Sequence, residues 1–340
     1  MGEQAWTDEE MPAHPFGFNF CYQNFFRNTV FPARNMKKRK VLIAFAGAAL
    51  ILLLPGLLSA QITDRNAIVA KGAKVEKLGD GYSFTEGPAV DRKGNVYFTD
   101  QPNDKIFRWS AETGEISLFT YQAGRSNGLY FDKKGKLLSA ADMYNQLWSF
   151  DKSGNHTVLV SDYKGKLLNG PNDLWIAPTG ALYLTDPLYK REYWTRNPER
   201  QQDGEHVYYL SADRSRFFPV DESLVKPNGI VGTPDGKKLY VADIGADKTY
   251  VYTINADGSL SGKKLFVSMG SDGMTIDNQG NVYLTGKGVT VFDKTGRQLT
   301  HIPIPENWTA NVVFGGKDRS TLFITAMGAV YGLKMKVKGV

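Results

Sequence analysis

The sequence has almost no cysteine: Cys21 is the only one in 340 residues. One cysteine excludes a disulfide framework within the chain and a thiolate metal site. Histidine is scarce too, with four residues. The formal net charge of +6 is spread along the chain and forms no concentrated basic face. We therefore expect no nucleic-acid partner.

Long apolar runs are also rare, apart from one near the start. Residues 36–60 combine a basic run, an apolar stretch over 41–58 and the small residues Ser59-Ala60. This three-part pattern is typical of a secretory signal peptide, with cleavage expected before Gln61. The alternative is a permanent membrane anchor, because about 18 apolar residues can span a bilayer. Either way we predict an exported protein, periplasmic or secreted, that meets a membrane only through this segment if it stays uncleaved.

The chain divides at this segment. Residues 1–35 carry aromatic side chains without helix caps or a clear period, and they precede Met36, where the complete export signal begins. We interpret them as a non-native or disordered N-terminal extension and leave them out of fold reasoning. The remaining residues, 61–340, lack helix-length amphipathic segments and are rich in tight-turn steps such as Asp-Gly and Asn-Gly. This composition favours an all-β fold.

Six segments of 61–340 repeat one pattern: a polar residue, about four mostly apolar residues, a Gly- or Asp-containing turn and a β-rich run. Their first residues are Glu86, Asn127, Asn172, Asn228, Asp272 and Asn311, separated by 41, 45, 56, 44 and 39 positions. Such spacing predicts a six-bladed β-propeller with four-stranded blades. The strand-like Lys74 to Leu78 and the last strands of the chain would share one blade and close the ring. The longest gap holds a charged, aromatic insertion, DPLYKREYWTRNPERQQDGEH.

The repeat also predicts a polar site at the propeller axis. The first residue of each copy and the end of its second strand share a face beside the central channel, and these ends are Asp100, Asp142, Asp186 and Asp243 in the first four copies. Turn chemistry alone explains any single Asn-Gly step. Six oxygen-bearing side chains in one register instead indicate a metal site, with Glu86 and Asp272 matching the charge of a divalent cation. Oxygen ligands favour Ca²⁺, with Mg²⁺ or Mn²⁺ as alternatives.

Zinc is the less favoured metal, because no cysteine is at hand and His156, His206 and His301 all fall outside the register. Asn228-Gly229 is a hairpin signal by its dipeptide. Pro234-Asp235-Gly236 stands a few residues later as a better turn, so we predict that Asn228 begins an inner strand instead.

The repeat resembles the gluconolactonase and senescence-marker-protein (regucalcin) family of six-bladed propeller hydrolases. The segments that carry the resemblance over 72–335 are TEGPAVD, GRSNGLYFD, LLNGPNDLW, YLTDP, KPNGI, SDGM and FGGKD. The resemblance implies a catalytic divalent cation on the axis, usually Ca²⁺, held by Glu86, Asn172, Asn228 and Asp272. It places Asp173 near the ion and the substrate. It also places Asn127 and Asn172 on the substrate side of the ion, and Arg125 near the rim of the channel.

The predicted activity is the metal-dependent opening of a sugar lactone by activated water, on a small-molecule substrate and by a monomer. Asp272 is our favoured general base, with Glu86 and Asp173 as the other candidates. Rim aromatics can stack on a sugar-like ring, and these are Tyr144, Tyr189, Tyr193 and Trp194.

Two other functions remain open. One is a phosphoester or organophosphate hydrolase that uses the same metal site, and another is a non-catalytic binding propeller with a structural ion. A serine hydrolase is disfavoured, because the G-x-S-x-G match at residues 124–128 leads into a strand rather than a helix.

Overall fold

The structure, a computed structural model, describes residues 67–340. The predictions for residues 1–35 and for the export segment at 36–60 therefore lie outside the described residues. Across residues 67–340 no helix has the length and apolar character needed to span a membrane.

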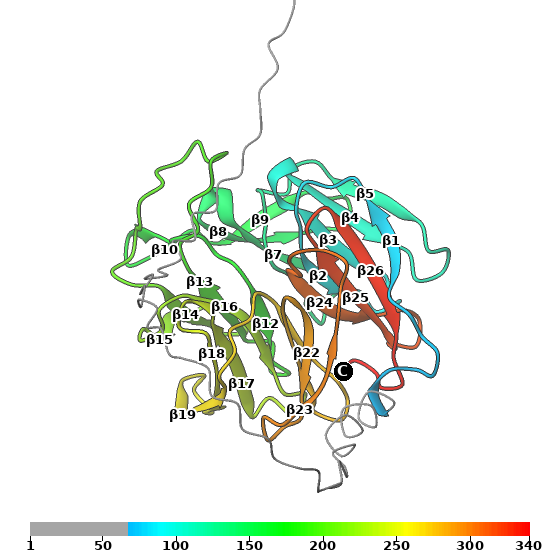
Figure 1. Cartoon of the computed structure of the whole chain (residues 1–340). Coiled ribbons are helices and arrows are strands. Elements are labelled where there is room, and N and C mark those ends of the chain that lie inside the picture. Colours follow the sequence, from blue (N-terminus) through cyan, green and yellow to red (C-terminus); the bar gives the residue numbers. More distant parts are fainter. Residues whose placement is uncertain (1–66) are drawn as a thin grey trace, which may run out of the picture. The chain divides into compact units, whose positions relative to one another are not determined.

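The described chain forms six four-stranded antiparallel sheets, which confirms the predicted six-bladed propeller (Figure 1). The innermost strands of the blades are β2 (Thr85–Val90), β6 (Leu129–Phe131), β12 (Leu174–Ile176), β16 (Pro227–Gly232), β20 (Met274–Ile276) and β24 (Asn311–Gly315). The second strands are β3 (Val96–Asp100), β7 (Leu137–Ala141), β13 (Leu182–Asp186), β17 (Lys238–Asp243), β21 (Val282–Gly286) and β25 (Thr321–Ala326).

The third and fourth strands complete each blade on its outer side. The third strands are β4 (Lys105–Trp109), β8 (Gln146–Phe150), β14 (His206–Leu210), β18 (Lys248–Ile254), β22 (Gly288–Phe292) and β26 (Ala329–Lys334). The fourth are β5 (Ile116–Thr120), β9 (His156–Val160), β15 (Phe217–Asp221), β19 (Leu260–Val267), β23 (Gln298–Ile302) and β1 (Glu76–Asp80). The small elements are β10 (Asp162–Tyr163), β11 (Lys166–Leu167), η1 (Gln101–Asn103), η2 (Asp142–Tyr144) and η3 (Ile244–Ala246).

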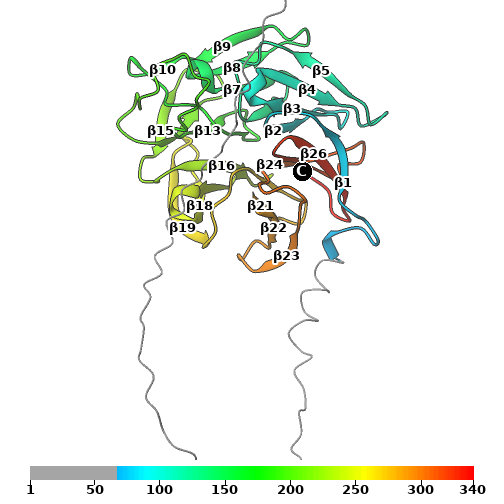
Figure 2. The same ribbon diagram turned by 45° about the horizontal axis from the view of Figure 1, so that its top comes forward.

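The two ends of the described chain close the ring, as the sequence predicts. Strand β1 pairs with β26, so the earliest strand completes the sheet built by the last three (Figure 2). Apolar side chains seal the joint: Phe98 of the first blade lies 5.7 Å from Phe323 of the sixth, measured between ring centroids. Closure pairs the strand edges that an open sheet would expose.

The turn between the first two strands of a blade has a simple local cause. In the first blade, the Asp91 carboxylate accepts hydrogen bonds from the backbone N–H groups of Lys93 (2.8 Å) and Asn95 (2.9 Å). Gly94 takes the left-handed conformation with φ of 87°. Asp and Gly are the residues whose chemistry suits such turns. In the fourth blade the turn lies at Pro234-Asp235-Gly236, between β16 and β17, which confirms that Asn228 belongs to an inner strand.

Candidate active site in the central channel

Five of the predicted polar residues begin the inner strands in equivalent positions, and we call them the spokes: Glu86, Asn127, Asn172, Asn228 and Asp272. Backbone hydrogen bonds define this register. The N–H of Asn172 donates to the carbonyl of Thr185 on the next strand (2.9 Å), and the N–H of Asn127 donates to Ala140 in the same way (3.0 Å). The spokes therefore enter the channel at one level.

The sixth blade departs from the expected register by one residue. In this blade it is the N–H of Ala310 that donates to a carbonyl of the second strand, that of Thr325 (2.9 Å). The N–H of Asn311 instead donates to the hydroxyl oxygen of Thr325 (3.0 Å), just as the N–H of Asp173 donates to that of Thr185 (3.0 Å). Asn311 thus belongs to the layer of Asp173, and the sixth spoke is apolar. The sequence predicts Asn311 in this register because it is the polar residue of the sixth copy. The backbone hydrogen bonds instead put Ala310 in the position equivalent to Asn172.

Glycine follows most spokes because neighbouring blades approach closely there. A Cβ added to Gly229 would lie 2.6 Å from the carbonyl oxygen of Asp272, and one on Gly128 would lie 2.6 Å from that of Asn172. A side chain in this position would push adjacent inner strands apart. The Asn-Gly and Asp-Gly steps at the channel therefore serve blade packing rather than hairpin turns.

This packing makes a stability prediction for Gly229→Ala. Because backbone rather than a flexible side chain meets the new methyl group, we expect the free energy of unfolding to fall by about 1–3 kcal/mol, the usual cost of overpacking. Denaturant unfolding of the variant and the parent measures this change. An unchanged unfolding midpoint would contradict the close packing of the spokes.

Two carboxylates face each other among the spokes without a cation to pair with. Burial raises the pKa of Glu86 well above its usual value, and the nearby Asp272 charge raises it further. Burial of its carboxyl group also raises the pKa of Asp272, although the residue as a whole stays partly accessible. Among the described residues neither forms an ion pair with Lys, Arg or His. Two repelling buried carboxylates fit a divalent cation between them.

The amide spokes supply neutral oxygen. The side chains of Asn127 and Asn172 are buried, at 2% and 3% exposure, yet no hydrogen bond joins either to another described residue. Asn228 is held firmly, because its Nδ2 donates to Asp272 Oδ1 (2.9 Å) and to the Tyr189 hydroxyl (2.9 Å). Buried amides normally have partners. Unpartnered ones beside two carboxylates match the ligand chemistry of a hard cation.

Asp173 lies one layer beyond the spokes. Its Oδ1 accepts the N–H of Leu174 (2.9 Å), and its Oδ2 accepts Asn311 Nδ2 (3.4 Å). Burial raises its pKa to about 7 despite these hydrogen bonds. Together with Asn311 it lines a cavity of about 750 Å³ that also reaches the hairpin turns of the opposite face, such as Asp132 to Gly135. Asp173 therefore closes the deep side of the spokes.

The aspartates at the ends of the second strands split into two groups. Asp186 accepts the N–H groups of Asn169 and Gly170 (both 2.9 Å), and Asp100 and Asp243 hold the loops of their own blades in the same way. Three of the four are thus structural. Asp142 differs, because its partners lie outside its own blade.

Asp142 anchors the insertion of the third blade, residues 187–205. Its carboxylate accepts hydrogen bonds from Trp194 Nε1 (3.3 Å) and Arg196 Nη2 (3.3 Å), besides one from Gln101 Nε2 (3.2 Å). Burial raises the pKa of Asp142 to about 6, and the nearby arginines Arg191 and Arg196 oppose that rise. The insertion is therefore tied to the same face of the propeller as the spokes.

The predicted rim residues divide accordingly. Tyr189 touches Asn228 through its hydroxyl, as given above, and Tyr193 carries the Arg125 guanidinium 4.5 Å from its ring centroid. Arg125 also donates to the carbonyl of Pro102, so the protein itself engages it. Tyr144 is 54% exposed and packs on Trp148, away from the spokes.

One residue of the site carried no sequence signal. Trp308 donates its Nε1 hydrogen to Asp272 Oδ2 (2.6 Å), so both oxygens of that carboxylate are fixed by donors. It precedes the sixth copy in an irregular segment. Ser126, the candidate serine nucleophile, is fully buried and bonds only to the Ala123 carbonyl and the Ser139 hydroxyl, without a histidine, which argues against a serine triad.

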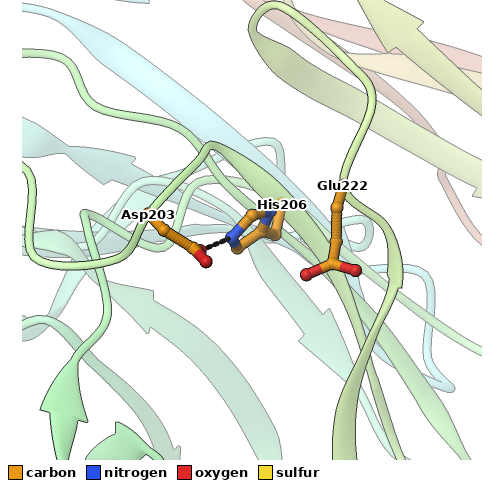
Figure 3. Close-up of side chains that lie close together, drawn as sticks. All are labelled: Asp203, His206 and Glu222. Carbon is orange, nitrogen blue, oxygen red and sulfur yellow. Dashed lines mark hydrogen bonds and ion pairs between the residues drawn. The ribbon is translucent and has the colours of Figure 1, made fainter.

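A separate group of three side chains that could ligate a metal lies just before and at the start of β14 and just after β15 (Figure 3). It consists of Asp203, His206 and Glu222, whose ligand atoms lie within 4.8 Å of one another. His206 Nε2 is already hydrogen-bonded to Asp203 (2.9 Å), and the Asp203 side chain is 82% exposed. As predicted, His206 stands outside the register of the spokes.

Comparisons with known proteins agree with this architecture. Residues 84–328 match the SMP-30/Gluconolactonase/LRE-like region. The gluconolactonase of Zymomonas mobilis subsp. mobilis is 29% identical over 304 residues, covering 81% of this chain and 85% of that protein. The solved gluconolactonase of Xanthomonas campestris superposes with a TM-score of 0.73 at 28% identity, covering 79% of this chain and 91% of that one.

A more distant solved structure shares the fold. Regucalcin of Agrobacterium tumefaciens, described as a calcium-binding protein, superposes with a TM-score of 0.65 at 21% identity, covering 79% of this chain and 96% of that one. With the family match spanning 84–328, the chain belongs to the SMP-30/gluconolactonase/LRE-like family.

Proposed function

We propose that this protein hydrolyses a sugar lactone with the help of a divalent cation, Ca²⁺ in first place, held in its central channel. Lactone hydrolysis is the activity named for its relatives from Zymomonas mobilis and Xanthomonas campestris. The observation that carries the proposal is the set of five spokes at one level of the channel. Within residues 67–340, its two carboxylates form no ion pair with a cationic side chain, and the side-chain amides of Asn127 and Asn172 form no hydrogen bond.

The proposed ligands are Glu86, Asn172, Asn228 and Asp272. Their donor atoms are carboxylate and amide oxygens, the set that Ca²⁺ prefers. When bound, such an ion polarises the lactone carbonyl and lowers the pKa of water. Calcium binding by the Agrobacterium regucalcin supports this choice of metal.

The residues of the chain then have separate tasks. Asp272, fixed at both oxygens by Asn228 and Trp308, is aimed in one direction and is our favoured base for the attacking water. Glu86 and Asp173 are the rivals for this role. The side-chain amide of Asn127 forms no hydrogen bond with another described residue, so it can donate to a substrate oxygen. Tyr189 accepts a hydrogen bond from Asn228 and so orients it.

The test is hydrolysis of a panel of aldonolactones by the purified protein, with and without a chelator. We expect ring opening that stops on chelation and returns when Ca²⁺ is added. Preference for phosphoesters or organophosphates would replace the lactonase by the alternative hydrolase. Bound metal without turnover of any substrate would leave a binding propeller with a structural ion.

We further propose that the protein acts as a monomer outside the cytoplasm. The support is the export pattern at 36–60, which lies outside the described residues. Mass spectrometry of the native protein from a periplasmic or secreted fraction should give a chain that starts at Gln61, with a monomeric mass in solution. A full-length chain in the membrane fraction would favour the anchor.

A further inference from the structure

The insertion at 187–205 is fixed at two points, one of which is the spoke Asn228. At one point the Tyr189 hydroxyl accepts Asn228 Nδ2 (2.9 Å). At the other, Trp194 and Arg196 bond to Asp142. The Arg196 guanidinium also stacks on Trp194, 3.5 Å from its ring centroid, which stiffens this end.

Two polar atoms between these anchors are buried and lack a hydrogen-bond partner among the described residues: Arg191 Nε and the Tyr193 hydroxyl oxygen. Arg191 Nε forms an ion pair with Asp142 Oδ2 at 4.0 Å, which is beyond hydrogen-bond distance. Leaving a buried donor unpaired costs free energy, most of all when the group is charged. Two such atoms on one short segment that also contacts a spoke are candidates for completion by a ligand.

Both residues belong to the surroundings of the spokes. The Arg191 guanidinium lies 5.2 Å from the ring centroid of Tyr189, the residue that contacts Asn228. The Tyr193 ring centroid lies 4.5 Å from the guanidinium of Arg125, which stands two positions before the spoke Asn127. A molecule bound at the spokes would therefore lie within reach of both side chains.

We propose that Arg191 and Tyr193 form a subsite that binds the hydroxyl groups of a sugar lactone and so select polyhydroxylated lactones over unsubstituted ones. The inference rests on the proposed function. Arg191 donates from a charged group, and the Tyr193 hydroxyl can donate or accept, which suits vicinal hydroxyls. A substrate without hydroxyls would leave these two buried atoms without a hydrogen bond, and sites that hydrogen-bond a substrate hydroxyl discriminate against analogues that lack it.

The kinetic test uses Arg191→Gln and Tyr193→Phe, with D-glucono-δ-lactone and δ-valerolactone as the substituted and unsubstituted substrates. We expect each variant to raise KM for the gluconolactone by about tenfold, the effect of losing one strong hydrogen bond, and to change KM for δ-valerolactone by less than twofold. Lys190→Gln is the matched control, because it removes the adjacent positive charge, whose partner is Glu199 (2.8 Å). Equal effects on both substrates, or none on either, would overturn the subsite.

A binding measurement separates this inference from the lactonase proposal. Calorimetry should show that the protein binds D-gluconate more tightly than 5-hydroxypentanoate, which has the same carboxylate without the added hydroxyls. Arg191→Gln should remove the difference, and Lys190→Gln should keep it. If the parent hydrolyses no lactone yet shows this preference, the subsite stands and the lactonase proposal fails. If the preference is absent or survives in Arg191→Gln, the subsite is wrong.

Discussion

We expect Asp272→Asn to abolish the proposed cation binding and lactone hydrolysis without loss of folded structure. The substitution removes one of two negative charges at the spokes and keeps the size of the side chain. Changes to groups that merely support metal ligands cost 10–100-fold in affinity or activity, so we expect a loss of at least about a hundredfold for a charged ligand. Isothermal titration with Ca²⁺ and the lactone assay measure the two losses.

Stability distinguishes this loss from unfolding. In the metal-free protein Asp272 repels Glu86 at a buried position, and the pKa values of both are raised. A neutral Asn relieves the repulsion, so chelated Asp272→Asn should unfold at the same denaturant concentration as the chelated parent or a higher one. A destabilised variant that keeps its affinity for Ca²⁺ would contradict the assignment.

Asp277→Asn is the matched control in the same blade. Asp277 is fully buried, and its carboxylate accepts the N–H groups of Gln279 and Asn281 and the Tyr283 hydroxyl, each at 2.9 Å. It works as a structural group away from the spokes. We expect this variant to lose stability while it keeps its Ca²⁺ affinity, the reverse of Asp272→Asn.

Metal removal should make the stability of the protein fall steeply as the pH rises. Burial raises the pKa of Glu86 and Asp272 and raises that of Asp173 to about 7, against a usual 3.8. A carboxyl group with a higher pKa in the folded state holds its proton more tightly there than in the unfolded chain. Its contribution to the free energy of unfolding is therefore full below the pKa of the unfolded state. This contribution is lost as the pH rises through the pKa of the folded state. For Asp173 this interval runs from about pH 4 to about pH 7.

A bound dication removes this loss, because it stabilises the ionised carboxylates. At a free concentration 100 times the Kd, it adds about 2.7 kcal/mol to the free energy of unfolding. Denaturant unfolding at several pH values between 5 and 8, with Ca²⁺ and with chelator, should give curves that diverge as the pH rises. Burial raises the pKa of Asp186 to about 7 as well, but away from the spokes, so it acts equally in both conditions. Parallel curves would contradict a cation among the spokes.

The repeat could be predicted from the sequence because the signals of a blade are local. An Asp and a Gly a few residues apart, as in Asp91 and Gly94, make the turn between two β-rich runs, and their recurrence counts the blades. Ring closure could be predicted because one strand precedes the first copy of the repeat. This strand is predicted at Lys74 to Leu78 and lies at Glu76–Asp80 in the structure. Each of these inferences needs only neighbouring residues or a period.

The remainder of the site depends on contacts between distant segments. Asp142 reads like the structural aspartates of three other blades, yet it binds Trp194 and Arg196, more than fifty positions away. Trp308 reaches Asp272 from 36 positions downstream. The sequence pattern wrongly predicts Asn311 as the channel residue of the sixth blade. Asn311 is polar and directly follows Ala310, which occupies that position in the structure. A one-residue difference in register changes which side chain faces the axis.

A crystal structure grown with Ca²⁺ tests the central claim most directly. We expect an ion on the channel axis, with oxygens of Glu86, Asn172, Asn228 and Asp272 about 2.3–2.6 Å from it. An empty channel at a Ca²⁺ concentration that supports hydrolysis would contradict the account. An ion bound instead between Asp203, His206 and Glu222 would contradict it as well.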